Sequence, residues 1–128
     1  GNYIEGWKKE EIKMLRLDDW LSKNEIDMKK ISYIWMDVQG HEGFVLDGAP
    51  MLFGDYNIPV IMEFWPKELQ RSGALPVLLQ RLKDYHYTGF ICMNDLDKID
   101  GDKPRDMTQI EDMSKKYADS FCDIFLIK

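Results

Sequence analysis

Cysteine and histidine are scarce in this chain, with two of each among its 128 residues. No Cys-x-x-Cys pair and no cluster of histidines accompanies Cys92 or Cys122, which argues against a zinc site. Both cysteines lie in apolar, strand-like runs, so a disulfide between them would require that the two strands be neighbours. No signal peptide or long apolar span is present. We therefore expect reduced thiols and a cytoplasmic protein.

Basic residues are also fewer than acidic residues. The chain has 17 lysines and arginines against 23 aspartates and glutamates, and its formal net charge is −6. A nucleic-acid-binding surface needs a basic patch, and an anionic membrane attracts basic segments. Because the two signs of charge are interspersed here, we expect neither nucleic acid nor a membrane as a partner.

The acidic loop at residues 95–101 does not have the spacing of a calcium site. An EF-hand needs acids at positions 1, 3 and 5, glycine at position 6 and glutamate at position 12. Counted from Asp95, the fifth position is Ile99 and the glycine comes one position late. We expect a solvated loop, and the sequence predicts no metal site.

Strand-like and helix-like segments alternate along the chain, which is typical of the α/β class. The length fits one domain, residues 1–128. Strands are expected at 12–17, 31–37, 59–64, 88–93 and 121–127, and helices at 18–24, 41–53 (with a break expected near Gly48 and Pro50), 66–85 and 106–117.

The most informative segment is the end of the strand expected at 31–37. An apolar, aromatic run stops at Asp37, a glycine turn follows at Gly40, and a helical pattern begins near Glu42. In open α/β sheets, ligands bind outside the carboxyl ends of the strands. Asp37 and its turn therefore lie where an α/β enzyme would carry out chemistry. The alternative is that Asp37 only caps the turn or helix that follows.

Several segments, in the same order, resemble the C-terminal half of FkbM-family methyltransferases. They are Leu15-Arg16-Leu17-Asp18-Asp19-Trp20-Leu21, Asp37-Val38-Gln39-Gly40-His41-Glu42, Val45-Leu46-Asp47-Gly48-Ala49 and Pro59-Val60-Ile61-Met62-Glu63-Phe64-Trp65-Pro66. The resemblance implies a Rossmann-like methyltransferase fold, S-adenosylmethionine as the cofactor, and O-methylation of a small-molecule hydroxyl, often on a sugar or a natural product. It also implies a mostly parallel sheet whose last strand is antiparallel.

One part of the family pattern is missing. Such enzymes bind the cofactor with a glycine-rich loop after the first strand, because a tight turn there approaches the ligand closely. The nine glycines of this chain are scattered singly and form no Gly-x-Gly. We interpret the chain as the C-terminal portion of a methyltransferase domain and expect its cofactor binding to be weak or absent.

The resemblance and the residue chemistry together suggest a site. Asp37, His41 and Glu42 are predicted to be catalytic, with Asp37 also orienting the cofactor amine or the acceptor hydroxyl. His41 is suited to accept a proton at neutral pH, although it is equally typical of an exposed helix start. Glu42 could instead only complement the helix dipole.

Two further acids and a tryptophan complete the predicted site. Glu63 and Trp65 follow the next apolar strand and are predicted to bind the substrate. The alternatives are a Glu63 carboxylate bonded to local amides and a Trp65 that packs on a helix. Asp18 resembles the acid that contacts the cofactor's adenine, but a simple N-cap is favoured for it.

Two expectations concern the molecule as a whole. A non-catalytic α/β module for binding or assembly is the alternative to an enzyme, because the glycine-rich loop is missing. The strand at 31–37 is apolar on both faces, as in a buried parallel strand, yet one of its sides would be unpaired here. We expect either that residues 12–17 pair with it or that two chains form a homodimer through it.

Overall fold

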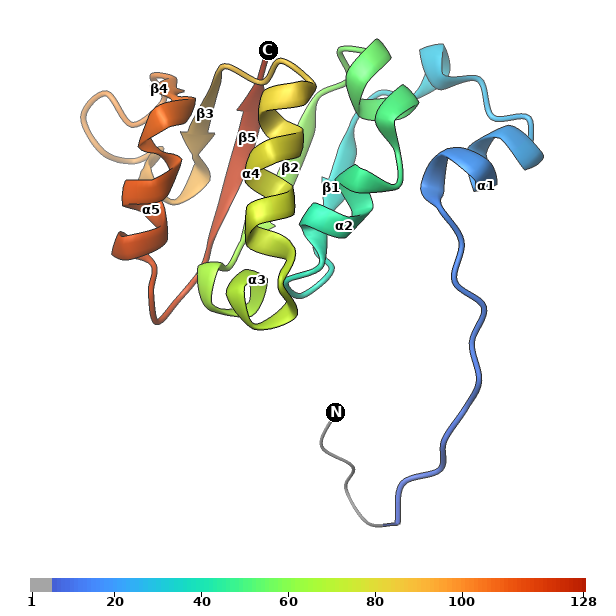
Figure 1. The fold of residues 1–128 in the computed structure, drawn as a ribbon. Helices are drawn as coiled ribbons and strands as arrows, with labels where there is room; N and C mark the ends of the chain where they lie inside the picture. Colours follow the sequence, from blue (N-terminus) through green and yellow to red (C-terminus); the bar gives the residue numbers. More distant parts are fainter. Residues whose placement is uncertain (1–5) are drawn as a thin grey trace.

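The computed structural model describes residues 6–128, which form one five-stranded sheet with helices packed against it (Figure 1). The strand order is β1-β2-β5-β3-β4. The strands are β1 (Ile34–Met36), β2 (Val60–Phe64), β3 (Gly89–Cys92), β4 (Arg105–Asp106) and β5 (Cys122–Ile127). The α-helices are α1 (Leu17–Lys23), α2 (Glu42–Asp47), α3 (Pro66–Ser72), α4 (Ala74–Asp84) and α5 (Ile110–Lys116). The structure is therefore α/β, as the sequence predicts.

Strand direction departs from the expected mostly parallel sheet. β1 pairs with β2 in parallel, whereas β5 is antiparallel to both β2 and β3, and β4 is antiparallel to β3. Three of these four pairings are antiparallel, so the prediction of a mostly parallel sheet is wrong. The strand directions that were expected are nevertheless present: β1, β2 and β3 run in the same direction, and the last strand is reversed. Two of the three antiparallel pairings arise because β5 inserts between β2 and β3.

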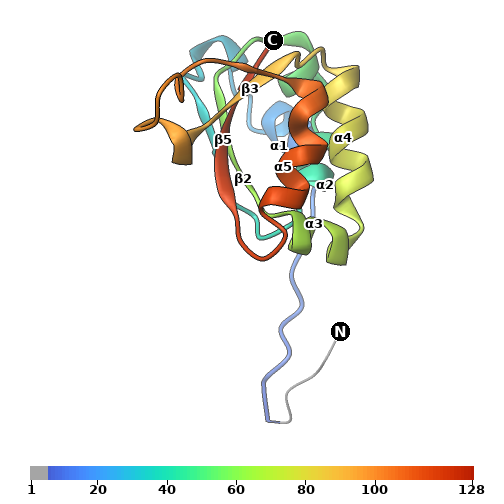
Figure 2. The ribbon, with the colours of Figure 1, turned by 90° about the vertical axis from the view of Figure 1, so that its left-hand side faces the viewer.

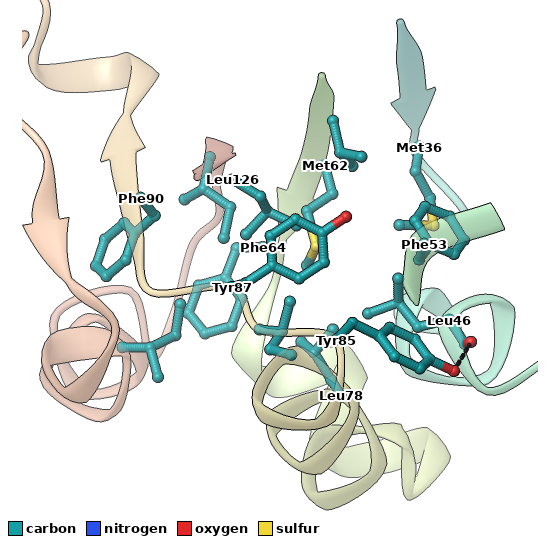
Figure 3. Packing of buried hydrophobic residues seen from close by; sticks show 14 of the residues in the cluster. Met36, Leu46, Phe53, Met62, Phe64, Leu78, Tyr85, Tyr87, Phe90 and Leu126 are labelled. Atoms are coloured by element: carbon teal, nitrogen blue, oxygen red, sulfur yellow. Dashed lines mark hydrogen bonds between the residues drawn. The ribbon is translucent and has the colours of Figure 1, made fainter. Parts of the chain in front are cut away.

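The core lies between the sheet and helices α2 to α5, and α3, α4 and α5 share one side of the sheet (Figure 2). Side chains of β5 alternate between the two faces, as expected from strand geometry, and Cys122, Ile124 and Leu126 are the buried ones. Figure 3 shows the packing, including the Tyr85 hydroxyl that donates a hydrogen bond to the carbonyl of Leu46 over 2.8 Å. Burying each large apolar side chain contributes about 1.5–3 kcal/mol.

The opposite face of the sheet carries an apolar row. Trp35, Ile61, Phe125 and Ile91 are aligned across β1, β2, β5 and β3 by the strand register. Trp35 is 61% exposed, and the other three side chains are half-buried. We define these four residues as the apolar row.

One expected strand and one expected strand pairing near the N-terminus are wrong. Residues 12–16 form no strand, and α1 starts at Leu17. Ile12 and Met14 are 79% and 87% exposed, because no neighbouring strand pairs with this segment. Among residues 6–128, β1 has a strand partner only in β2, so the expected pairing of residues 12–17 with its outer side is also wrong.

The helix expected at 41–53 is divided. α2 ends at Asp47, and a π-helical segment follows at Met51–Asp55. Gly48 and Pro50 lie between the two pieces, where a break was expected. None of the helices within residues 6–128 is long and apolar enough to cross a membrane.

Candidate functional site

Three carboxylates converge at the carboxyl ends of β1 and β2. Met36 of β1 is aligned with Met62 of β2, so the residues that follow each of them, Asp37 and Glu63, lie side by side. Glu42, the first residue of α2, joins them. One ligand oxygen from each of the three side chains lies within 4.8 Å of the other two. The predicted convergence of Asp37, Glu42 and Glu63 is therefore confirmed, and we call these three residues the carboxylate cluster.

A tight turn between β1 and α2 shapes the cluster. Gly40 has a φ of +88°, a conformation that residues with a side chain rarely adopt. A Cβ atom at Gly40 would lie 2.6 Å from the backbone of Glu68 in α3, so the turn is pressed against that helix. The Ser72 hydroxyl donates a hydrogen bond to the Gly40 carbonyl over 2.6 Å. These contacts fix the position at which Glu42 enters α2.

Two members of the cluster are buried and incompletely hydrogen-bonded. Glu42 is 0% exposed and Glu63 is 6% exposed. Oε1 of Glu42 accepts a hydrogen bond from the amide of Val38 over 3.0 Å. Oε2 of Glu42 and Oε1 of Glu63 have no hydrogen-bond partner. Because an unpaired buried polar atom costs about 1–3 kcal/mol, such atoms indicate a water, a ligand or a proton that the protein's own groups do not supply.

Asp37 is the exposed member of the cluster. Its Oδ1 atom accepts a hydrogen bond from the side-chain amide of Gln39 over 2.9 Å. This contact holds one carboxylate oxygen within the turn. Asp37 is therefore the cluster member that a ligand in solvent can reach most directly.

The electrostatics of the cluster favour neutralisation. Burial raises the pKa of Glu63 to about 7, assisted by the nearby charges of Asp37, Glu42 and Asp123. Burial is likewise the main cause of the raised pKa of Glu42, against hydrogen bonds from backbone amides that lower it. Desolvation and like charges both disfavour the ionised form of a carboxyl group. The cluster can therefore hold a proton or a positively charged group.

Asp123 of β5 is a site residue that the sequence did not reveal. It is aligned with Glu63 in the antiparallel β2–β5 pair, and burial together with the charge of Asp37 raises its pKa. Its backbone amide donates to the side-chain oxygen of Asn94 over 3.4 Å. In the sequence, the feature that could have pointed to Asp123 is a single acid within an otherwise apolar strand. Its place beside Glu63 depends on the β5 register, which the sequence pattern does not reveal.

His41 and Trp65 lie outside the carboxylate cluster. His41 is exposed at the residue before α2, and its ring centroid is 6.0 Å from that of Phe44. Trp65 precedes α3 and is half-buried, with its ring centroid 5.8 Å from that of Phe121. The roles predicted for these two residues stay predictions.

Asp18 has a structural role outside the carboxylate cluster. It does not cap α1, whose N-cap is Arg16 without a side-chain hydrogen bond. Its two oxygens accept hydrogen bonds from the amides of Met51 and Leu52, over 2.7 and 3.2 Å. The carboxylate therefore caps the π-helical segment, and the N-cap favoured from the sequence is wrong. The contact of Asp18 with adenine stays a prediction.

Comparison with protein families gives one match. Residues 4–88 of the 128 match the Methyltransferase FkbM domain, a range that contains the whole carboxylate cluster. Neither the comparison with curated proteins nor the comparison with solved structures gives a match. Because the family match spans well over half of the chain, this chain belongs to the FkbM methyltransferase domain family.

Proposed function

We propose that this domain takes part in S-adenosylmethionine-dependent methyl transfer to a hydroxyl group of a small molecule, such as a sugar or a natural product. The observation that carries the proposal is the carboxylate cluster, which lies at the carboxyl ends of two parallel strands in a chain of a methyltransferase family. Ligands of open α/β sheets bind at this edge.

A Rossmann-like arrangement is part of the proposal. Its support is that β1, β2 and β3 share one direction while β5 is reversed between β2 and β3, with helices connecting the like-directed strands. The apolar row on the opposite face also agrees with a larger sheet protein in which further elements cover that face.

The residues present fit part of a cofactor site. When bound, S-adenosylmethionine supplies a methyl group whose bond to the sulfonium sulfur breaks as the acceptor oxygen attacks. Asp37 fits the cofactor's ammonium group, because it is an exposed carboxylate at the end of β1. Asp18 does not fit, because both of its oxygens are used by backbone amides. With no Gly-x-Gly in the chain, we expect these 128 residues alone to bind the cofactor weakly.

The chain's own residues would then act mainly by positioning, which can contribute several kcal/mol to the lowering of a barrier. Glu63, buried near the end of β2, would orient the acceptor hydroxyl. The proton that this hydroxyl loses would pass to a carboxylate of the cluster. Trp65, whose ring is tilted against that of Phe121, would form an apolar wall beside the acceptor, and His41 would line the entrance at the start of α2.

Methyl transfer can be measured with the full-length product of the gene, radiolabelled S-adenosylmethionine and a mixture of hydroxylated sugars and natural products. Asp37→Asn and Glu63→Gln should each lower the rate by about 100-fold or more, the range lost with a positioned proton-transfer group. Asp19→Asn, on the exposed surface of α1, is the matched control and should retain the wild-type rate. Wild-type rates in both cluster variants would overturn the proposed site, and a methyl group found on nitrogen or carbon would overturn the acceptor class.

A non-catalytic α/β module remains the second candidate, supported by the missing glycine-rich loop. Calorimetry with S-adenosylhomocysteine separates the two candidates. Micromolar binding by the full-length gene product supports the enzyme, and no binding by that product supports the module.

We also propose a cytoplasmic location and a homodimer. Two free, buried cysteines agree with a reducing compartment. Within residues 6–128, no strand pairs with the side of β1 that faces away from β2, and Trp35 on this strand is exposed. Both features agree with pairing between two chains.

A further inference from the structure

The carboxylate cluster combines oxygen ligands that are distant in the sequence. Asp37 follows β1, Glu42 begins α2 and Glu63 lies in β2, so no local spacing in the sequence indicates a metal site. The expectation of no metal was based on such spacings alone. The fold nevertheless brings one oxygen from each side chain to within 4.8 Å of the other two.

Close acidic residues alone are not a binding site, but two of these are buried with unpartnered atoms. Glu42 is 0% exposed and Glu63 is 6% exposed, and each has one carboxylate oxygen without a hydrogen-bond donor. Both residues supply an oxygen to the cluster. A carboxylate is rarely buried unless it is paired with a cation or coordinates a metal. In the part of the chain that the structure describes, neither of these two carboxylates forms an ion pair.

A shared proton is the competing explanation. One proton between Asp37 and Glu63 would relieve the repulsion within that pair. It would leave Oε2 of Glu42 buried and without a partner. Two unit charges about 4 Å apart repel by roughly 4 kcal/mol at an effective dielectric of 20. A divalent cation that contacts all three side chains at once offsets the repulsion of all three pairs by its attraction to each carboxylate.

From this geometry we propose that Asp37, Glu42 and Glu63 form a binding site for one hard divalent cation. All three ligands are carboxylate oxygens, which suit Mg²⁺, Mn²⁺ and Ca²⁺, and the cluster contains no nitrogen or sulfur ligand that would favour zinc or copper. Two oxygens on opposite sides of an ion with bonds of about 2.4 Å are about 4.8 Å apart. The oxygens of the cluster lie within this distance of one another, so a single ion of this size can contact all three.

Three carboxylates leave coordination positions open. Hard cations in proteins bind six or more oxygens, and water or a substrate oxygen completes the set. Because Asp37 is exposed, these open positions face solvent beside it. The site needs no methyl transfer for its existence, so cation binding can be tested without any assumption about the reaction.

The test is a titration of the EDTA-treated 128-residue chain with Mn²⁺, followed by calorimetry and electron paramagnetic resonance. We expect one Mn²⁺ per chain with a dissociation constant below about 1 mM, equivalent to about 4 kcal/mol of binding free energy. Saturating Mn²⁺ should also raise the melting temperature, because the ion binds the folded state. In ¹⁵N-labelled protein, bound Mn²⁺ should broaden the amide signals of Val38, Gln39 and Phe64 before those of α5.

Glu42→Gln and Glu63→Gln should each weaken Mn²⁺ binding at least tenfold. Glu42→Gln keeps an oxygen that can accept from the Val38 amide, and Glu63→Gln provides an independent variant should the first fail to fold. Glu111→Gln, exposed on α5, is the matched control and should bind as the wild type does. No binding at 5 mM Mn²⁺ (about five times the proposed limit), or binding unchanged in both cluster variants, or broadening centred elsewhere would overturn the proposal.

Discussion

Replacement of Gly40 should disrupt the turn that positions the carboxylate cluster. It combines a φ of +88° with a backbone contact that leaves no room for a side chain, whereas Gly73 has a φ of +81° and nothing within 4 Å of an added Cβ. Left-handed backbone strain alone costs about 1–2 kcal/mol. Gly73→Ala should therefore lower the free energy of unfolding by about 1 kcal/mol, and Gly40→Ala by about 3 kcal/mol or more. Urea denaturation of both variants measures the difference, and equal losses would show that the approach of Glu68 is unimportant.

Asp95 corrects the expectation of a solvated acidic loop. It is 2% exposed and forms ion pairs with Lys98, Arg105 and Lys116, which brings the loop and α5 together. The hydrogen bond from Lys98, together with the neighbouring positive charges, lowers the pKa of Asp95 from 3.8 to about 2. The sequence pattern did not reveal this because Arg105 and Lys116 meet Asp95 only in the folded chain.

This lowered pKa predicts a pH dependence of stability. A carboxyl group with a lower pKa in the folded state stabilises the fold above its unfolded pKa, and this contribution is lost as the pH falls through the folded pKa. Stability from Asp95 should therefore be complete above about pH 5 and decline between about pH 4 and pH 2. Because Lys98 and Lys116 are partly exposed, we expect a loss of at most about 2 kcal/mol.

Urea unfolding at pH 5 and pH 3 tests this expectation. At pH 5, Asp95→Asn should have a lower free energy of unfolding than the wild type. This difference in free energy should be smaller at pH 3. Asp97→Asn, an exposed neighbour in the same loop, should follow the wild type at both values. A constant gap between wild type and Asp95→Asn would contradict the assignment.

At the scale of elements, β1 is an edge strand that pairs only with β2 among residues 6–128. The Ile34 amide donates a hydrogen bond to the carbonyl of Pro59, on the side of β1 that faces β2, over 2.8 Å. In a parallel strand the next residue, Trp35, then directs its amide and carbonyl to the outer side. Two chains paired through this edge would use those groups. Proline is tolerated on an edge strand when its missing amide faces away from the sheet.

Trp35→Pro should therefore prevent dimer formation while the β1–β2 pair persists. Light scattering at increasing protein concentration should show a dimer for the wild type and a monomer for Trp35→Pro. Trp35→Phe retains the outward amide and is the control that should remain dimeric. A wild-type protein that stays monomeric at high concentration would rule out the homodimer.

Elements with strong periodic patterns were predicted best. Leu78 and Leu82 are fully buried along α4, as their helical spacing indicates. The alternation of β5 likewise matches its burial. Residues 12–17 alternate as well, but a strand needs a neighbour, and the described chain provides none. The local pattern of apolar residues therefore indicates whether a segment is a helix or a strand. It does not indicate which strands pair with each other.

At the scale of the whole molecule, the candidate site was predictable in part. Asp37 and Glu63 follow or end apolar strands, so parallel pairing alone places them together, and this is observed. Asp123 was not predictable, because it reaches the site only through the insertion of β5 between β2 and β3. The same insertion is why a sheet with three like-directed strands has mostly antiparallel pairings.

A titration of the ¹⁵N-labelled 128-residue chain with S-adenosylhomocysteine tests the assigned site most directly. We expect weak binding, with a dissociation constant above about 0.1 mM, and amide shifts concentrated at residues 37–42 and 63–65. Micromolar affinity would contradict the expectation that cofactor contacts are missing. Shifts centred instead on the apolar pocket between α4 and α5, which is lined by Leu79, His86 and Met107, would contradict the assignment of the site to the carboxylate cluster.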